Sequence, residues 1–182
     1  MNEKNYLNRC VIIESYNNAW PEKFIFEKNQ ILSAIGDENP VVEHIGSTAI
    51  VGLAAKPIID IMVGVNNLAI ANLCIELLKT IGYEYVPKLE EQFPNRRFFH
   101  KGPNLPNKHF HLHMVEVNSD FWYRQILFRD YLRANPKAVA EYQELKLTLS
   151  EKFNDSVAGY CDAKTDFIQE ILKEAKESRH AQ

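Results

Sequence analysis

Cysteine is scarce in this chain. The three cysteines, Cys10, Cys74 and Cys161, lie far apart and show no paired spacing. Disulfide-stapled domains and cysteine-based zinc sites both need such pairs, so neither class of protein fits. We expect three reduced thiols, two of them in the hydrophobic core.

Long apolar runs and an excess of basic charge are also missing. No stretch approaches the ~20 apolar residues that span a bilayer, and no apolar core of a signal peptide follows the first residues. Lysine and arginine number 21 against 24 aspartate and glutamate residues, a formal charge of -3, which is not the basic balance of a typical nucleic-acid binder. We expect a cytoplasmic protein with no membrane partner. Nucleic acid is not the expected ligand, although a local basic patch would be compatible with it.

The remaining composition is that of an ordinary folded protein. Hydrophobic residues make up 46% of the 182 residues and charged residues 25%, close to the averages for globular domains. This length suits one compact domain with one substantial core. We therefore predict a single domain over residues 1–182, with a sheet-containing core over about 1–118 and a helical extension over about 119–182.

The N-terminal pattern predicts two strands around a helix. Residues 11–13 and 41–45 have the apolar, β-branched composition of short strands. Between them, residues 21–35 carry apolar residues mostly on one helical face, and Pro21 suits the first position of that helix. The second strand ends abruptly at residues 46–48, where we expect a sharp turn.

The next segment reads as a buried strand followed by further sheet and helix. Residues 57–65 are almost continuously apolar, which indicates a central strand buried on both faces, with Asp60 inserted. The following elements are expected to be a helix over 68–78, a strand over 83–86, and a hairpin of strands over 96–101 and 108–117.

The last third is helical. Ser119 or Asp120 is suited to cap a helix that ends before Pro136, and two further helices are expected over 137–153 and 156–176. The predicted fold class is therefore α+β, a mixed β-sheet with flanking helices and a helical C-terminal third.

The segment around Gly46, Ser47 and Thr48 has the features of a phosphate-binding turn. A strand that runs through Gly-Ser into a helix start leaves backbone N–H groups and a small hydroxyl facing outward, which suits phosphate oxygens. Lys56 is placed to contact a phosphate, because it directly precedes the strand of Asp60. If that strand returns beside the first one, its carboxylate lies near the turn and can hold Mg²⁺. A plain turn and a structurally satisfied aspartate explain the same pattern equally well.

These residues carry a resemblance to a known family. The string His-Ile-Gly-Ser-Thr-Ala at 44–49, continued by residues 52–61, resembles the signature of the GrpB family, which is placed in the nucleotidyltransferase-like superfamily that includes DNA polymerase beta. The similarity extends over almost the whole chain, through Trp20-Pro21, His111-Leu112-His113, residues 127–133, Tyr142 and Leu145-Lys146.

The resemblance implies a nucleotidyltransferase-like fold in which a Gly-Ser turn binds a nucleoside triphosphate and strand carboxylates bind two Mg²⁺ ions. Gly46 and Ser47 match the phosphate role, and Asp60 matches the first metal ligand. Active members of the superfamily commonly have a second acid two residues later, where this chain has Met62. A two-metal displacement needs ligands for both ions. Glu116 is the best candidate for the missing carboxylate, and Glu43 is a weaker one.

Two histidines form the next candidate feature. On a strand, His111 and His113 place their imidazoles on one face, where both can contact a metal, a phosphate or a reacting group. Glu116 is out of phase with them, so either the histidines or Glu116 face the site. The family likeness favours the histidines, although a pair on an ordinary sheet surface is the alternative. His44 either joins them or hydrogen-bonds within its own loop.

Seven cations follow within a short span, and some of them are candidates for phosphate contacts. Arg129 and Arg133 share one helical face, and Arg129 is our candidate among them. Surface salt bridges are the more frequent explanation for any single arginine. The full set is Arg96, Arg97, Lys101, Lys108, Arg124, Arg129 and Arg133.

Three functions remain open. The first is an Mg²⁺-dependent (or Mn²⁺-dependent) nucleotidyltransferase that moves a nucleotidyl group from a nucleoside triphosphate to an unidentified small-molecule or protein acceptor, with Asp60, His111 and His113 as the catalytic residues. The second is a nucleotide- or metabolite-binding module that has lost catalysis, which Met62 motivates. The third is a metal-dependent hydrolase built on His44, His111, His113 and Asp60.

Overall fold

The computed structural model describes residues 11–102 and 109–180, and its centre is a mixed five-stranded sheet. In spatial order the strands are β1, β2, β5, β4 and β3. β2 and β5 are parallel, whereas the other neighbouring strands are antiparallel. The strands are β1 (Val41–Ile45), β2 (Ile59–Val65), β3 (Glu84–Tyr85), β4 (Arg97–Lys101) and β5 (Phe110–Glu116).

The apolar run predicted as a buried strand forms β2, which lies between β1 and β5. Its alternate residues Ile59, Ile61, Val63 and Val65 are almost fully buried on one face of the sheet. Asp60 lies on the other face, paired in register with Ile45 of β1 and His111 of β5. The fold therefore brings the end of β1 and the start of β5 to the two sides of the inserted acid.

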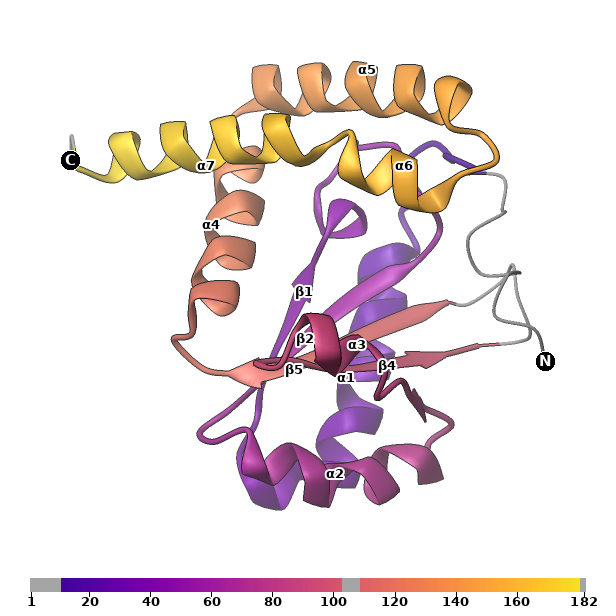
Figure 1. Ribbon diagram of the computed structural model, residues 1–182, viewed down its shortest axis with the longest axis vertical. Helices are drawn as coiled ribbons and strands as arrows, with labels where there is room; N and C mark the ends of the chain where they lie inside the picture. Colours follow the sequence, from indigo (N-terminus) through magenta and orange to yellow (C-terminus); the bar gives the residue numbers. More distant parts are fainter. Residues whose placement is uncertain (1–10, 103–108, 181–182) are drawn as a thin grey trace.

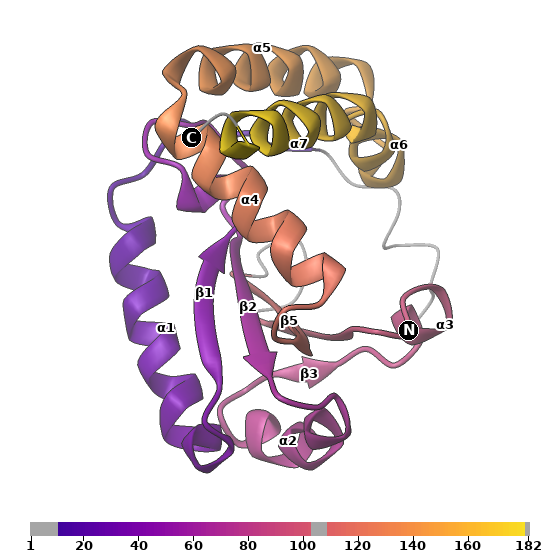
Figure 2. The same cartoon turned by 90° about the vertical axis from the view of Figure 1, so that its left-hand side faces the viewer.

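Two helices cover the face that carries the alternate apolar residues of β2. α1 (Trp20–Ile35) and α2 (Ala69–Thr80) form the main core cluster with this face, as Figure 2 shows. Their apolar stripes supply Ile31 and Ile35 from α1 and Cys74 and Leu78 from α2. The burial of these stripes is the expected driving force for docking both helices on the sheet.

The opposite face is partly covered by α4 (Asp120–Ala134), whose N-cap Ser119 accepts a hydrogen bond from the Trp122 N–H. The Trp122 ring packs directly over Gly64, where a Cβ atom would overlap with it. Three further helices form a layer across one end of the sheet (Figure 1). They are α5 (Pro136–Lys152), α6 (Val157–Asp162) and α7 (Thr165–His180), and the short elements are η2 (Gly36–Glu38), η3 (Ser47–Ala49) and α3 (Leu89–Gln92).

The predicted order of elements is largely confirmed, with two corrections. Residues 11–13 do not form a strand, and the nearest sheet contact is an isolated bridge between Glu14 and Ala55. The helix expected over 156–176 is divided into α6 and α7, because the chain turns at residues 163–164. Of the two cysteines in the described ranges, Cys74 is buried and Cys161 is exposed.

Parts of two predictions fall outside the described residues. These are Cys10 and the turn of the hairpin at residues 103–108, although its two strands pair as β4 and β5. No helix within the described ranges has the length and apolar character that a membrane crossing requires.

A buried ion pair joins α1 to the sheet. Glu27 on α1 is 1% exposed, and its carboxylate accepts a hydrogen bond of 2.8 Å from Nζ of Lys101 on β4. Removing one partner of a buried ion pair leaves the other charge without a partner and without hydration, which destabilises the folded state. This pair therefore fixes α1 against the edge of the sheet.

We expect Lys101→Met to lower the free energy of unfolding by about 3 kcal/mol, because it leaves Glu27 buried without a cation. Urea unfolding followed by circular dichroism measures the change. Lys79→Met is the matched control, since Lys79 pairs with Glu76 on the surface at 3.3 Å with both side chains mostly exposed. Equal effects of the two substitutions would show that the buried pair has no special role.

Candidate functional site

The turn after β1 lies against the carboxylate of Asp60. Gly46 has a φ of 70°, and a Cβ atom at this position would overlap with the Asp60 side chain. Only glycine therefore allows the turn backbone to approach the acid so closely. Gly46 and Ser47 thus lie beside Asp60, as the sequence analysis predicted.

Thr48 anchors this turn to the start of β2. Its hydroxyl donates a hydrogen bond of 3.1 Å to the carbonyl of Ile58, and the Nε2 atom of His44 lies 3.0 Å from the same hydroxyl oxygen. Since the hydroxyl proton is used at Ile58, His44 donates to Thr48. His44 also stacks on Phe24 of α1 at 4.6 Å between ring centroids. It therefore bonds within its own loop, on the opposite face of the sheet from Asp60.

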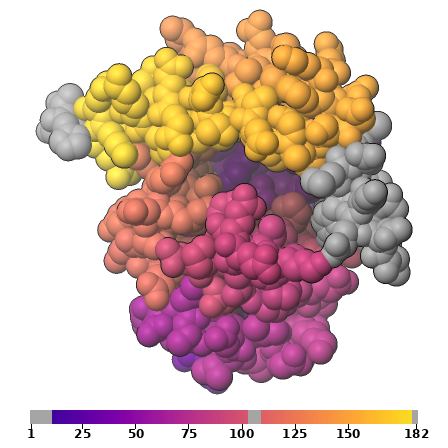
Figure 3. Space-filling view, in the orientation of Figure 1, coloured from indigo at the N-terminus to yellow at the C-terminus, as the bar shows by residue number. Residues whose placement is uncertain are grey.

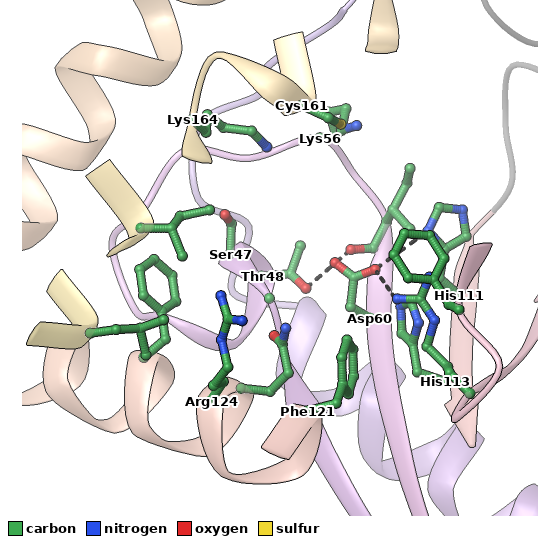
Figure 4. Close-up of a pocket in the computed structure, with 18 of the residues that line it drawn as sticks. Ser47, Thr48, Lys56, Asp60, His111, His113, Phe121, Arg124, Cys161 and Lys164 are labelled. Carbon is green, nitrogen blue, oxygen red and sulfur yellow. Dashed lines mark hydrogen bonds and ion pairs between the residues drawn. The ribbon is translucent and has the colours of Figure 1, made fainter. Parts of the chain in front are cut away.

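Asp60 is held by the two histidines of β5 (Figure 4). Its Oδ1 atom lies 3.4 Å from Nδ1 of His111 and 4.0 Å from Nε2 of His113. Burial alone would raise the pKa of Asp60, but the hydrogen bond from His111, the neighbouring imidazoles and Lys56 hold the pKa below its usual value. The carboxylate is therefore ionised at neutral pH and available to a cation.

His113 is enclosed by aromatic rings. The rings of Phe98 and Phe121 have centroids 5.1 Å and 5.8 Å from the imidazole, and its Nδ1 atom has no hydrogen-bond partner. Burial lowers the pKa of His113 to about 3, although Asp60 acts in the other direction. The imidazole is consequently neutral at physiological pH, with an unused nitrogen.

A pocket of about 860 Å³ opens in front of these residues. The surface is hollowed between the C-terminal helices and the segment around α3 (Figure 3). The turn, Asp60 and both histidines form its floor, and α4 contributes Phe121, Arg124 and Phe128. The helical layer contributes Tyr142, Lys146, Tyr160, Cys161 and Lys164, and the segment before β4 contributes Phe93 and Arg96.

Three lysines gather around two tyrosine rings in this pocket. The Nζ atoms of Lys56 and Lys164 lie 5.5 Å and 4.3 Å from the ring centroid of Tyr160, and Nζ of Lys146 lies 4.9 Å from that of Tyr142. None of the three makes an ion pair within the described part of the chain. Lys146 is 1% exposed, and its Nζ donates to the carbonyl of Ala54.

Burial lowers the pKa of Lys164, and it lowers the pKa of Lys146 to about 7. In both cases burial disfavours the charged form, and neither lysine has an acidic partner among the described residues to oppose the shift. We call Lys56, Lys146 and Lys164 the lysine wall. An anion bound beside them would relieve this unfavourable electrostatic environment.

Lys146 was not among the predicted site residues, although its position in the sequence indicates a buried charge. Within α5, Ala138, Tyr142 and Leu149 form a buried stripe, and Lys146 stands in that stripe at helical spacing. A charge at such a position marks a buried polar contact. Lys164 and Cys161 offered no comparable signal, because their place in the pocket depends on how the chain turns between α6 and α7.

Two predicted site residues are not brought to the pocket. Glu116 lies at the far end of β5, paired with Val65, and its Oε1 accepts a hydrogen bond of 2.9 Å from the Leu68 N–H. A regular strand places it on the opposite face from His111, so it supplies no second carboxylate beside Asp60. The structure instead makes Glu116 a support for the start of α2.

Arg129 is buried between two carboxylates, away from the pocket. It contacts Glu43 at 2.6 Å and Asp130 at 2.8 Å, and it also donates to the carbonyl of His44. Its guanidinium is therefore engaged in joining α4 to β1 rather than free for phosphate. Glu43, the weaker candidate for a metal ligand, is engaged by its ion pair with Arg129.

Some of the other predicted cations line the pocket, and others form ion pairs outside it. Arg96 and Arg124 line the pocket. Arg97, Lys101 and Arg133 pair elsewhere, with Glu90, Glu27 and Asp130, and Lys108 lies outside the described residues.

A preformed transition-metal centre is not evident in this part of the chain. Within residues 11–102 and 109–180, no three histidine, cysteine, aspartate or glutamate side chains are grouped to hold a metal ion. With His44 on the other face of the sheet, the four-ligand arrangement of the hydrolase hypothesis is not formed. Any metal at Asp60 would need further oxygen ligands from a substrate or from water.

The architecture is that of the nucleotidyltransferase fold. The structure of Cid1 in complex with its short product ApU is similar to this chain with a TM-score of 0.52 and 15% sequence identity, over 83% of this chain and 48% of that one. At this level of identity the likeness shows the fold alone. It confirms the predicted fold class.

More similar proteins identify the family. The GrpB protein family model matches residues 10–174. The glutamate-rich protein GrpB of Alkalihalophilus pseudofirmus is 39% identical over 167 residues, which cover 90% of this chain and 95% of that one. The crystal structure of the conserved protein GrpB from Enterococcus faecalis has a TM-score of 0.81 and 39% identity, over 92% of this chain and 99% of that one. This chain belongs to the GrpB family.

The buried imidazole of His113 predicts a loss of stability in acid. Its pKa is lowered in the folded state, so the unfolded chain binds the proton more tightly below about pH 6.5. Lowering the pH from about 7 to about 5 should therefore cost about 2 kcal/mol through this group. In urea unfolding at the two pH values, His113→Gln should lose less stability than the wild type by this amount.

His109→Gln provides the control for this measurement, because His109 is exposed just before β5. We expect it to show the same pH dependence as the wild type. If His113→Gln also retains the full loss in acid, the imidazole is not held neutral in the folded protein.

Proposed function

We propose that this chain is a nucleotidyltransferase that moves a nucleotidyl group from a nucleoside triphosphate to a small-molecule or protein acceptor. The observation that carries the proposal is the contact between the Gly46 turn and Asp60. It puts phosphate-binding backbone and a cation-binding carboxylate at one place, in front of the lysine wall. The fold likeness supports the same class of reaction, because Cid1 is described with the product ApU.

The triphosphate is assigned to the space between Ser47 and the lysine wall. Backbone N–H groups and a hydroxyl at the turn suit phosphate oxygens. Lys56 and Lys164, which have no acidic partners among the described residues, would supply charge for a triphosphate and stabilise pyrophosphate as a leaving group, and a bound anion would favour the charged form of Lys146 as well. A pocket of about 860 Å³ is within the usual range for a ligand the size of a nucleotide.

The donor set fits one divalent cation. Asp60 and Asp120 are the carboxylates among the described residues that line the pocket. Mg²⁺ and Mn²⁺ prefer oxygen ligands, and Mg²⁺ is commonly held by one or two carboxylates together with substrate phosphates. Asp60 would hold the ion in that way. A bound ion would polarise the phosphate under attack and neutralise its charge.

His111 is placed to act as the base. It lies beside the Asp60 carboxylate and lines the pocket, so it can accept the proton of an acceptor hydroxyl. As the new P–O bond forms, the bond to pyrophosphate breaks. His113 lies two residues further along β5, and because burial keeps its own imidazole neutral, it adds no positive charge next to Asp60.

One observation favours a second candidate, a nucleotide-binding module without catalysis. Met62 follows Asp60 on the same strand face and is 0% exposed, packed with Ile45, Val115 and Trp122. No second carboxylate stands at this position of β2, so a two-metal mechanism lacks a ligand there. Release of pyrophosphate from a nucleoside triphosphate separates the candidates, because only the transferase produces it.

Nucleotide binding should depend on metal through Asp60. In a thermal-shift panel of the four ribonucleoside triphosphates with and without Mg²⁺ or Mn²⁺, we expect metal to increase the stabilisation by at least one of them. A ligand at 100 times its Kd stabilises the folded state by about 2.7 kcal/mol. Asp60→Asn keeps the shape of the side chain and should abolish the metal-dependent part of the shift.

Glu116→Gln is the control for this panel, since it removes a carboxylate from the same sheet but keeps the acceptor for the Leu68 N–H. It should behave as the wild type. A metal-dependent shift that survives in Asp60→Asn and disappears in Glu116→Gln would overturn the assignment of the metal to Asp60.

The lysine wall should contribute to nucleotide affinity even without metal. We expect Lys164→Met to raise the Kd for the bound nucleotide by about tenfold, because a hydrogen-bonded charge pair contributes roughly 1.5–3 kcal/mol. Isothermal titration calorimetry measures this change. Lys173→Met removes an exposed lysine from α7, outside the pocket, and should leave the Kd unchanged. Equal Kd values for both variants would remove Lys164 from the binding site.

A further inference from the structure

Arg96 is a cation in the pocket that the proposed phosphate and metal sites do not use. It lies directly before β4, and its guanidinium carbon is 4.3 Å from the ring centroid of Phe93 and 5.1 Å from that of Phe121. The guanidinium has no acidic partner among the described residues, and its buried Nε has no hydrogen-bond partner. Arg96 therefore presents unused donors to the pocket, between two aromatic rings.

Two other arginines, Arg97 and Arg129, have acidic partners, which Arg96 lacks among the described residues. Arg97 pairs with Glu90 at 3.1 Å, and Arg129 pairs with Glu43 at 2.6 Å. Withdrawing a guanidinium from water without an anion is costly. Two phenylalanine rings stabilise the cation in part, but they accept none of its N–H groups. An oxyanion that enters from the pocket would supply the missing partner.

The position of Arg96 relative to Asp60 indicates which part of the reaction it serves. In Figure 4, Ser47, Lys56 and Lys164 lie on one side of Asp60, and His111 and His113 lie on the other, near Phe121. Arg96 belongs to the second side, since it lies against Phe121 and its charge acts on His113. An in-line displacement at phosphorus needs its nucleophile opposite the leaving group.

We propose that the acceptor is a small molecule that carries a carboxylate or phosphate group, which Arg96 binds while the acceptor hydroxyl lies at His111. This inference rests on the proposed transferase function. The planar fork of a guanidinium matches both oxyanions in a bidentate manner. Phe93 and Phe121 shield this contact from water, which strengthens it.

With this acceptor, the bonds formed and broken in the nucleotidyl transfer can be written in full. Its hydroxyl oxygen attacks the α-phosphorus of the nucleoside triphosphate, and the new P–O bond replaces the bond to pyrophosphate. The hydroxyl proton passes to the imidazole of His111, and pyrophosphate leaves on the side of the lysine wall. The acceptor oxyanion stays on Arg96 and is unchanged, so Arg96 determines which hydroxyl compounds are accepted.

Anion binding at Arg96 can be measured before the acceptor is known. Protein with ¹⁵N-labelled arginine is saturated with Mg²⁺ and a non-hydrolysable analogue of the nucleoside triphosphate that stabilises it most in the thermal-shift panel, so that the lysine wall is occupied. The Arg96 Nε–H signal, assigned through its absence in Arg96→Lys, is then followed by NMR during titration with malonate, methylphosphonate or neutral malonamide. We expect a saturable shift with at least one anion and none with malonamide.

Binding of the probes is then compared across variants by calorimetry. Arg96→Met should raise the Kd of the bound anion by about tenfold or more, and Arg96→Lys should also weaken it, because it keeps the charge but loses the fork. Arg179→Met, which removes an exposed arginine on α7, should have no effect. A preference for malonate indicates a carboxylate-bearing acceptor, and a preference for methylphosphonate indicates a phosphorylated one.

Different results would contradict the acceptor subsite at Arg96 and the proposed transferase function. If neither anion shifts the Arg96 signal, or if Arg179→Met weakens the anion as much as Arg96→Met does, the acceptor subsite is overturned while nucleotide binding stands. If no analogue of the four ribonucleoside triphosphates binds at all, the titration is repeated without nucleotide. A saturable shift at Arg96 would then support an oxyanion site and reject the transferase.

Discussion

The close approach of Gly46 to the carboxylate of Asp60 is the constraint on which the pocket depends. β1 and β2 are antiparallel, and the pairing of Ile45 with Asp60 brings the end of one strand to the start of the other. The turn folds onto the acid because Gly46 has no Cβ and a positive φ, and Thr48 fixes it to Ile58. Any side chain at residue 46 would separate the backbone of the turn from the carboxylate.

Successive side chains of β2 point to opposite faces of the sheet, so one face lines the pocket and the other forms the core. Asp60 faces the pocket, whereas Ile59 and Ile61 face the core under α1 and α2. The parallel neighbour β5 has the same phase, so His111 and His113 join Asp60, and Leu112 joins the core. A register shift of one residue in either strand would bury the charged groups and expose the core. The requirements for folding therefore also fix the geometry of the site.

Local patterns predicted the parts of the site that depend on neighbours in sequence. The Gly-Ser turn, the acid within an apolar strand and the shared face of the two histidines follow from strand periodicity and turn chemistry, whereas the resemblance to the GrpB family favoured that face for the site. Arg129 could not be assigned in this way, because its partner Glu43 is 86 residues distant. Nor could Glu116, since its hydrogen bond to Leu68 depends on how α2 docks. These roles are set by tertiary contacts that periodicity does not encode.

The pocket differs in charge from the rest of the chain, and this difference favours an anionic ligand. The chain as a whole is slightly acidic, with a formal charge of -3, yet the pocket carries Arg96, Arg124 and the lysine wall against Asp60 and Asp120. Acids elsewhere are used to pair cations that hold helices in place, as Glu27 and Glu43 do. A cleft of one sign in a body of the other concentrates its ligand by electrostatic attraction. Cationic groups on both sides of Asp60 therefore suit two anionic ligands, one on the lysine wall and one at Arg96, with the reacting phosphorus between them.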